Sequence, residues 1–182
     1  MLFTRFAPSP TGYLHRGHLL SALFVFAAAD LFSAKVRLRI EDHDQSRARK
    51  EYIDSIPEDL ERFGFKFESV SLQSKRQALY EKYVQFLFSK QKLYPCSCSR
   101  KKLFEENPVN ADGEVIYSGH CLKNPINKNS DFALRFKTPD KTITWEDLLL
   151  GKFEENPKNQ CGDFTIKDRI SQWTYQFAVC VD

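Results

Sequence analysis

The sequence predicts an α/β fold built around a parallel sheet, on the strength of three observations near its start. Residues 2–6 are largely apolar and suit a buried strand, and residues 19–32 stay apolar for long enough to form a helix. Residues 35–40 then alternate basic and apolar side chains, with the period of two that is typical of a strand. Strand, helix and strand in this order predict a βαβ unit with parallel strands and a right-handed crossover.

Length and composition describe an ordered globular protein with a mild basic charge. The 182 residues suffice for one sizeable core, alone or with a small appended module, and 42% of them are hydrophobic. The formal net charge of +3 permits a nucleic-acid partner without requiring one. The apolar helix contains Ser21 and Asp30 and lacks a small-residue cleavage site, so we expect no signal peptide, no membrane span and a cytoplasmic location.

The segment between the first strand and the first helix is a candidate anion site. Pro8, Pro10 and Gly12 break the strand and set up a turn that leads into the helix. Unpaired N–H groups and the helix dipole both point at such a turn, where His15 and His18 could donate hydrogen bonds to phosphates. Two histidines and two glycines at this turn suggest a phosphate site, although an arbitrary histidine pair of this spacing is more often found on the surface without a role.

A polar cluster, Glu-Asp-His-Asp at 41–44, follows the second strand. In open α/β sheets, ligands bind at the carboxyl ends of the strands. We therefore expect Glu41 to face the same crevice as Arg5, Ser9 and the two histidines.

The next part of the chain predicts two further helices. Ser46 is expected to cap a helix that runs to about Phe63. Pro57 is expected to kink or split this helix, and Gly64 to end it. A second helix is expected over 75–93. Beyond it we expect a short helix at 100–106 and short strands at 131–136, 141–145, 162–166 and 173–181, the last almost continuously apolar and therefore central.

The cysteines indicate a metal site rather than disulfides. Their number, five, is odd, and Cys96 and Cys98 form a Cys-x-Cys pair in a loop-rich segment that also contains Cys121. Cys161 and Cys180 are expected to be buried as small hydrophobic residues.

Taken together, these motifs resemble the class I aminoacyl-tRNA synthetases. The segment Arg5-Phe-Ala-Pro-Ser-Pro-Thr-Gly-Tyr-Leu-His-Arg-Gly-His18 is similar to their first signature, and Leu38-Arg-Ile-Glu-Asp-His-Asp44 is similar to the glutamyl subfamily. Within that subfamily the chain most resembles the short glutamyl-queuosine tRNA(Asp) synthetases, through Gly162-Asp-Phe164 and Gln176. The likeness continues through 73–74, 94–98 and 175–182, and so covers the whole chain in order.

The resemblance implies a Rossmann-like parallel sheet with helices on both faces and a zinc-bearing insertion. It divides the chain into the first half of the catalytic domain at 1–93, an acceptor-binding-like insertion at 94–160 and return strands at 161–182. The family's second ATP signature, a lysine- and serine-rich loop, is not visible in the sequence. The resemblance therefore implies a truncated chain that is inactive or weakly active by itself.

The resemblance also implies how the substrates are bound. ATP, accompanied by Mg²⁺, would be held by His15, Gly17 and His18, and the two histidines would be the catalytic residues. Arg16 departs from the family, which usually has an apolar residue there. Arg5 suits a carboxylate of L-glutamate, which it can pair in bidentate fashion, and Glu41 suits the α-ammonium group. The glutamate site as a whole would comprise Arg5, Ala7, Ser9, Glu41 and Tyr175.

The insertion resembles the zinc site of the queuosine enzymes. Its implied ligands are Cys96, Cys98, Tyr117 and Cys121, which would close a structural site around one zinc ion. His120 is the alternative fourth ligand, because imidazole is a commoner zinc donor than phenolate. Direct neighbours such as His120 and Cys121 rarely both reach one metal, which favours Tyr117.

The predicted reaction is ATP-dependent, AMP-forming activation of L-glutamate, followed by transfer to the queuosine base of tRNA(Asp). One alternative is the catalytic fragment of a glutamyl-tRNA synthetase that charges tRNA(Glu). Another is a non-catalytic tRNA-binding paralogue that kept the fold. The protein is expected to act as a monomer and without a membrane partner.

Overall fold

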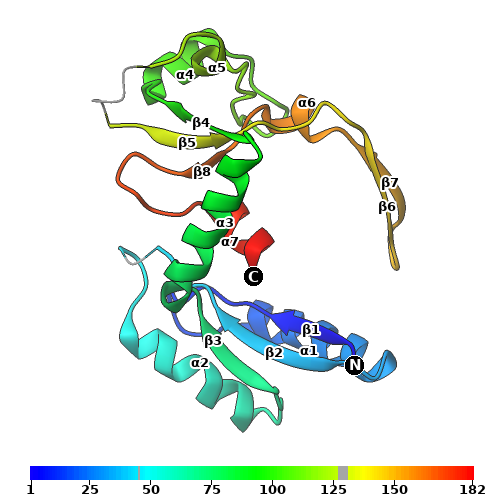
Figure 1. Ribbon diagram of the computed structural model, residues 1–182. Helices are drawn as coiled ribbons and strands as arrows, with labels where there is room; N and C mark the ends of the chain where they lie inside the picture. The colour runs from blue at the N-terminus through cyan, green and yellow to red at the C-terminus, as the bar shows by residue number, and fades with distance from the viewer. Residues whose placement is uncertain (45, 127–130) are drawn as a thin grey trace. The chain divides into compact units, whose positions relative to one another are not determined.

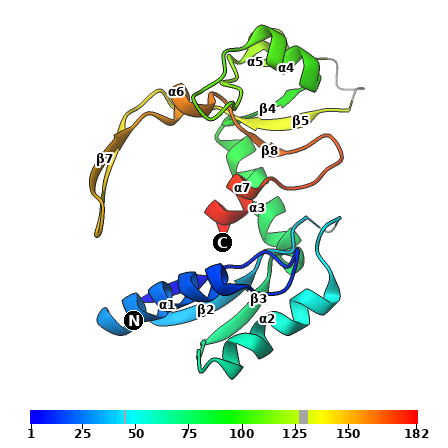
Figure 2. The same ribbon diagram turned by 180° about the vertical axis from the view of Figure 1, so that it is seen from behind.

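The computed structural model describes residues 1–44, 46–126 and 131–182, which form two compact units (Figure 1). The N-terminal unit is Met1–Tyr80 and the C-terminal unit is Glu81–Asp182. The boundary between the units falls within helix α3 (Gln77–Ser89), which is labelled in Figures 1 and 2. The functional division expected at 93 and 160 stays a prediction.

The N-terminal unit contains the predicted βαβ unit, extended by a third strand. Strand β2 lies between β1 and β3, and both pairings are parallel. The α/β fold class with a parallel sheet is therefore confirmed. In chain order the elements are β1 (Phe3–Phe6), α1 (Arg16–Leu31), β2 (Lys35–Ile40), α2 (Lys50–Arg62), β3 (Ser69–Leu72) and the 3₁₀ helix η1 (Gln73–Arg76).

Helices α1 and α2 cover the same face of this sheet. The ring of Phe26 on α1 packs 4.7 Å from that of Phe65, which follows α2. On the opposite face, the Arg37 guanidinium lies over the ring of Phe3, at 3.8 Å. Two right-handed crossovers that advance in one direction along a sheet leave both helices on one side, so helices on both faces are not found among the described residues. The shared core consists of Phe6, Ala22, Ala29, Val36, Leu38, Ile40, Ile56 and Leu60.

Helix α2 begins later than predicted and is continuous. Ser46 does not cap it, because its N–H and hydroxyl both donate to Asp44 Oδ1 in a separate turn, at 3.1 and 2.6 Å. Pro57 lies inside one unbroken helix. Gly64 follows the helix with φ +84°, a left-handed conformation that glycine adopts without strain, so its role as the terminator is confirmed.

The C-terminal unit contains an antiparallel sheet in the order β4-β5-β8 and a separate β6-β7 hairpin. The helix predicted over 75–93 ends at Ser89, and Leu93–Cys96 forms the buried strand β4 instead. The short helix predicted at 100–106 is confirmed as α4. The elements are β4 (Leu93–Cys96), α4 (Arg100–Glu106), α5 (His120–Lys123), β5 (Ala133–Phe136), β6 (Ile143–Asp147), β7 (Gly151–Glu155), α6 (Pro157–Cys161), β8 (Thr165–Lys167) and α7 (Tyr175–Val181).

The last predicted strand is wrong, since residues 175–181 form helix α7. A short apolar run does not distinguish a buried strand from a buried helix, and burial here follows helical spacing. Trp173, Phe177 and Ala178 are buried, whereas Cys180 is exposed, which also corrects its expected burial. The strand expected at 162–166 is β8, which pairs with β5 in the antiparallel sheet.

Among the described residues, no helix combines the length and the apolarity that crossing a membrane requires.

Candidate functional site

The predicted histidine pair lies at the start of helix α1. His15 is the N-cap residue, and its Nδ1 accepts a hydrogen bond from the Gly17 N–H at 3.1 Å. The His15 N–H in turn donates to His18 Nδ1 at 3.2 Å, and the two ring centroids are 4.0 Å apart. Because each Nδ1 accepts a hydrogen bond from a backbone N–H, each ring in its neutral form carries its proton on Nε2. The pair therefore offers two Nε2–H donors at the start of α1.

The environment of His18 favours the neutral ring. Partial burial lowers the pKa of His18 below its ordinary value, and the neighbouring His15 lowers that pKa further. Only the neutral imidazole can accept the His15 N–H at Nδ1, so the hydrogen-bond geometry and the lowered pKa require the same protonation state.

Gly17 leaves room for the ring of His15. A Cβ added at Gly17 would lie 2.9 Å from His15 Cε1 and 3.1 Å from Nδ1, so any side chain there would displace the imidazole. The structure thus brings together all three residues predicted to bind ATP.

An open hollow of about 460 Å³ lies beside His18. It forms where the carboxyl end of β1 turns toward the N-terminus of α1. The turn is fastened to the end of β2, because the Glu41 N–H donates to the Pro8 carbonyl at 3.0 Å. The hollow places three of the five predicted glutamate ligands, Arg5, Ala7 and Ser9, next to His18. Its lining residues are Arg5, Phe6, Ala7, Pro8, Ser9, Thr11, His18, Ser21 and Val25.

Two predicted glutamate ligands do not line this hollow. The Glu41 carboxylate is 2.7 Å from Arg39 Nη2, and the two side chains are only 6% and 5% exposed. Its negative charge is thus already compensated by a buried guanidinium. Tyr175 begins α7 in the C-terminal unit and is half exposed. The roles of Glu41 and Tyr175 in binding glutamate stay predictions.

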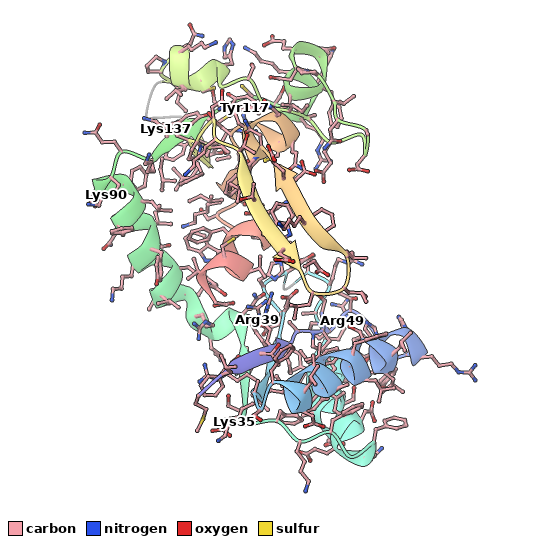
Figure 3. The ribbon with its side chains drawn as sticks, turned by 90° about the vertical axis from the view of Figure 1, so that its right-hand side faces the viewer. Lys35, Arg39, Arg49, Lys90, Tyr117 and Lys137 are labelled. Atoms are coloured by element: carbon pink, nitrogen blue, oxygen red, sulfur yellow. The ribbon has the colours of Figure 1, made fainter. Side chains whose placement is uncertain are left out.

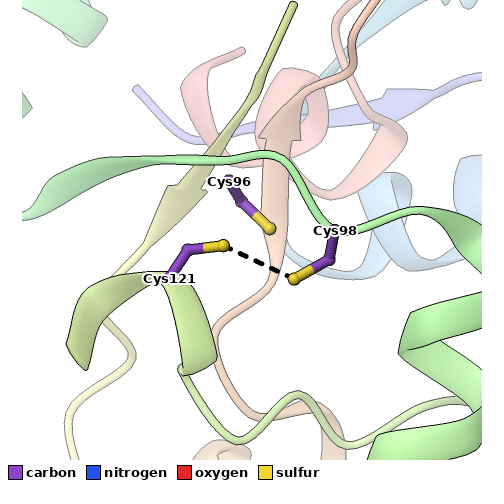
Figure 4. A group of neighbouring side chains, drawn as sticks. All are labelled: Cys96, Cys98 and Cys121. Carbon is purple, nitrogen blue, oxygen red and sulfur yellow. Dashed lines mark hydrogen bonds between the residues drawn. The ribbon is translucent and has the colours of Figure 1, made fainter. Parts of the chain in front are cut away.

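The second candidate site is a group of three thiols in the C-terminal unit (Figure 4). Cys96 ends strand β4, Cys98 lies in the loop after it, and Cys121 lies on α5. The three Sγ atoms all lie within 4.8 Å of one another, and those of Cys98 and Cys121 are 3.4 Å apart. The structure therefore brings Cys121 together with the Cys96-x-Cys98 pair, as the prediction of a metal site requires.

The Tyr117 hydroxyl supplies a fourth donor. It lies 3.4 Å from Cys96 Sγ and 3.5 Å from Cys98 Sγ, and it accepts the Cys121 N–H at 2.9 Å. Tyr117, labelled in Figure 3, is buried in the C-terminal unit. We call Cys96, Cys98, Tyr117 and Cys121 the four-donor cluster.

The four-donor cluster has the dimensions of a closed zinc site. A tetrahedral zinc ion with Zn–S bonds of about 2.3 Å and a Zn–O bond of about 2.0 Å separates its sulfurs by about 3.8 Å and sulfur from oxygen by about 3.5 Å. His120 does not join this group. Its Nε2 lies 3.2 Å from Lys102 Nζ and its Nδ1 lies 3.9 Å from Glu106 Oε2. The residues present therefore fit a zinc ion with Tyr117 rather than His120 as the fourth donor.

The thiols differ in acidity. Burial raises the pKa of Cys121, but hydrogen bonds from the Tyr117 hydroxyl and the Ser97 N–H outweigh it and lower that pKa to about 7. Burial raises the pKa of Cys98 to about 11. Zinc binds the thiolate form of cysteine, so a zinc ion taken up here would displace the Cys98 proton, and its affinity would rise with pH.

Gly162 is required by a close approach of two backbones. It adopts φ +63°, and a Cβ placed on it would lie 2.1 Å from the Tyr117 carbonyl oxygen. We expect Gly162→Ala to lower the free energy of unfolding by about 3 kcal/mol, because strain and overpacking add. Urea denaturation measures this loss. Gly113→Ala is a matched control for strain alone, since Gly113 also has positive φ and a Cβ placed on it would meet nothing within 4 Å. Equal losses in both variants would contradict a steric role for Gly162.

Comparison with known proteins identifies the family. Residues 1–182 match the family described as tRNA synthetases class I (E and Q), catalytic domain. Because the match covers the whole chain, the protein belongs to this family, and the resemblance inferred from the motifs is confirmed.

Individual relatives are ligases of the glutamyl subfamily. Glutamyl-Q tRNA(Asp) synthetase of Neisseria meningitidis is 37% identical in an alignment 182 positions long, which covers 98% of this chain and 61% of the relative. Glutamate–tRNA ligase of Aquifex aeolicus is 36% identical in an alignment 189 positions long, which covers 98% of this chain and 40% of the ligase. The crystal structure of a glutamate tRNA ligase from Elizabethkingia meningosepticum in complex with its amino acid matches with a TM-score of 0.81 at 27% identity, covering 100% of this chain and 41% of that one. The chain therefore spans less than two thirds of the length of these relatives.

Proposed function

We propose that the protein takes part in ATP-dependent activation of L-glutamate to glutamyl-adenylate, followed by transfer to the queuosine base of tRNA(Asp). The observation that carries this proposal is the His15–His18 pair, with two Nε2–H donors at the start of α1, beside a hollow lined by Arg5, Ala7, Ser9 and His18. Family membership supports the same chemistry.

In the proposed reaction, a glutamate carboxylate attacks the α-phosphate of ATP, a P–O bond forms, and pyrophosphate leaves. The protein contributes position and charge stabilisation rather than a covalent intermediate. The two Nε2–H groups donate to phosphate oxygens, whose negative charge grows in the transition state. Mg²⁺ accompanies ATP and neutralises phosphate charge.

Arg5 is the cation assigned to a glutamate carboxylate. It lines the hollow together with Ser9 and the backbone at Ala7. A guanidinium can pair a carboxylate through two parallel N–H···O bonds, which an ammonium cannot do.

We expect Arg5→Lys to raise the KM for glutamate about 10- to 100-fold while leaving the KM for ATP within about twofold, because one bidentate charge-assisted pair is worth about 1.5–3 kcal/mol. Steady-state ATP–pyrophosphate exchange at varied glutamate and ATP separates the two constants. Arg37→Lys is the control, since Arg37 lies over Phe3 and does not line the hollow. An equal rise in both KM values for Arg5→Lys would contradict the assignment.

The zinc ion is proposed as structural. When bound it would cross-link the end of β4 to α5 through the four-donor cluster, which leaves no open coordination position for water. Such a link organises a segment that is too short and polar to build a large core of its own.

The choice of tRNA(Asp) carrying queuosine rests on Gly162-Asp-Phe164, on Gln176 and on Tyr117 within the four-donor cluster. The identities of 37% and 36% with the two kinds of ligase do not separate them. The alternative is that the chain is part of a glutamyl-tRNA synthetase acting on tRNA(Glu). Activity in the cytoplasm and as a monomer is part of the proposal.

Glutamate-dependent ATP–pyrophosphate exchange tests this function. By the resemblance, a queuosine enzyme activates glutamate without tRNA, whereas a glutamyl-tRNA synthetase needs tRNA(Glu) first. The expected result is exchange without tRNA, at a low rate because the resemblance implies a chain that is only weakly active by itself, followed by labelling of queuosine-containing tRNA(Asp) with ¹⁴C-glutamate. Exchange only after addition of tRNA(Glu) would overturn the choice of acceptor. ATP and glutamate binding without exchange under either condition would favour a non-catalytic paralogue.

A further inference from the structure

Asp163 carries a buried carboxylate, and its backbone is bonded to Tyr117, one of the residues of the four-donor cluster. Asp163 is 1% exposed, and its position follows from the contact of Gly162 with the backbone of Tyr117. The Tyr117 N–H donates to the Cys161 carbonyl, and the Asp163 N–H donates to the Tyr117 carbonyl, both at 3.3 Å. Asp163 is thereby joined directly to the residue that supplies the fourth donor.

The Asp163 carboxylate links three segments of the chain. Its Oδ2 accepts the Tyr94 hydroxyl at 2.7 Å, and Tyr94 lies on β4 two residues before Cys96. Its Oδ1 accepts the Thr138 N–H at 3.0 Å and the ammonium of Lys158. A carboxylate with this many donors holds each of them in a defined direction.

Further contacts extend from Asp163 toward α5 and the ring of Tyr117. Oδ2 lies 3.4 Å from the position of a Cβ on Gly119, which is the N-cap residue of the helix that carries Cys121. The Asp163 carbonyl accepts Arg135 Nη1 at 2.7 Å, and the Arg135 guanidinium lies 3.8 Å above the Tyr117 ring. Asp163 is thus bonded through its carboxylate to the strand that carries Cys96 and through its backbone to Tyr117, and its carboxylate lies next to the start of the helix that carries Cys121.

We propose that Asp163 is a positioning residue that holds the three protein segments of the four-donor cluster at metal-binding distance. This proposal rests on the proposed zinc site. The carboxylate holds the Tyr94 hydroxyl, the Thr138 N–H and the Lys158 ammonium on one side while the backbone of the same residue holds Tyr117 on the other. Without it the phenol and the Cys96 thiol lose their shared anchor, although all four donors remain in the chain.

The test compares cobalt binding by the wild-type chain and by Asp163→Asn. Co²⁺ replaces zinc in thiolate sites and reports its ligands by absorption, so affinity and geometry are measured together by titration against a chelator. The Lys158 side chain is 31% exposed, so its ammonium can turn to water in the variant, and we expect the variant to fold. We expect about 10- to 100-fold weaker Co²⁺ binding and a shifted d–d band, with thiolate charge-transfer intensity retained, as is typical when a residue that orients metal ligands is lost.

Two further variants serve as a control and as a milder test of the same contacts. Asp42→Asn is the matched control, because Asp42 is a buried carboxylate of the N-terminal unit that accepts the N–H and hydroxyl of Ser74 at 2.8 and 2.5 Å. It should leave Co²⁺ affinity within twofold of the wild type. Tyr94→Phe removes only the hydrogen bond from the Tyr94 hydroxyl to Asp163. It should weaken Co²⁺ binding by a smaller factor with the same band shift, and it provides the test if Asp163→Asn does not fold.

The possible results distinguish failure of the positioning role from failure of the proposed metal site. Tight Co²⁺ binding by the wild type with unchanged affinity and spectrum in both Asp163→Asn and Tyr94→Phe overturns the positioning role alone. A wild-type chain whose three thiols take up no Co²⁺ overturns the metal site, and the positioning role with it.

Discussion

Replacement of Cys98 by serine is expected to release zinc from the C-terminal unit. A hydroxyl does not ionise near neutral pH and is a poor zinc ligand, so three donors would remain where a closed site needs four. Structural zinc sites bind with apparent free energies of about 10–16 kcal/mol, and we expect the loss of one thiolate to weaken binding by about 1,000-fold or more. Metal analysis of the purified protein should fall from one zinc per chain to a small fraction of that value.

The same substitution should unfold the segment that the metal organises. Cys98 and Cys121 come from different segments, and their sulfurs are 3.4 Å apart. Hydrogen exchange of residues 96–126 should therefore accelerate in Cys98→Ser and, equally, in wild type treated with a chelator. Exchange in the N-terminal unit, which has a separate core, should not change.

Cys180→Ser is the matched control for this experiment. It makes the same chemical change at an exposed thiol of α7, so metal content and exchange should stay at wild-type values. Full zinc content in Cys98→Ser, or loss of zinc in Cys180→Ser, would contradict the site.

The parts of this protein that are predictable from its sequence are those in which local signals agree. Alternation at 35–40, an apolar helix and a turn rich in proline lead to the same βαβ unit, and the structure places His15 at the helix N-cap as that turn requires. Gly64 is a second example, because a left-handed residue after a helix favours glycine whatever surrounds it.

The secondary structure is predicted wrongly where tertiary packing, rather than local sequence, determines it. Residues 175–181 are apolar enough for a strand, but burial of Phe177 and Ala178 selects a helix. The helix predicted to reach Leu93 ends at Ser89, because Leu93 belongs to a strand that pairs with β5 and buries Leu93, Tyr94 and Cys96.

The pairing of buried charges is also not predictable from the sequence. The sequence predicts Glu41 as an open ligand, and only the structure shows that Arg39, two residues earlier, already pairs with it. For Asp163 the available signal is a glycine followed directly by an acid within an apolar stretch. Its partners lie at 94, 135, 138 and 158 and cannot be inferred from spacing.

Replacement of His18 by asparagine is expected to slow glutamate-dependent pyrophosphate exchange by about 100- to 1,000-fold. The asparagine amide oxygen can take the place of Nδ1 and still accept the His15 N–H, but the Nε2–H donor is lost. Removing one donor aimed at developing charge costs about 2.7–4 kcal/mol in the transition state. Since the helix cap survives, thermal stability and the KM for ATP should change little. His18→Ala, which removes the cap too, should additionally lose about 1 kcal/mol of stability.

The pH dependence of exchange supplies an independent readout of the same residue. Burial and His15 lower the pKa of His18 from 6.5, so its neutral form, which accepts at Nδ1 and donates at Nε2, persists into mildly acidic solution. Stabilisation by the cap is complete above pH 6.5 and is lost as the pH falls through the lowered pKa. The acid limb of the rate profile should therefore have its midpoint below 6.5 and should disappear in His18→Asn. His120→Asn, at a ring that contacts Lys102 and Glu106, should keep both the rate and the limb. An acid limb that persists unchanged in His18→Asn would assign the titration to another group and remove His18 from the transition state.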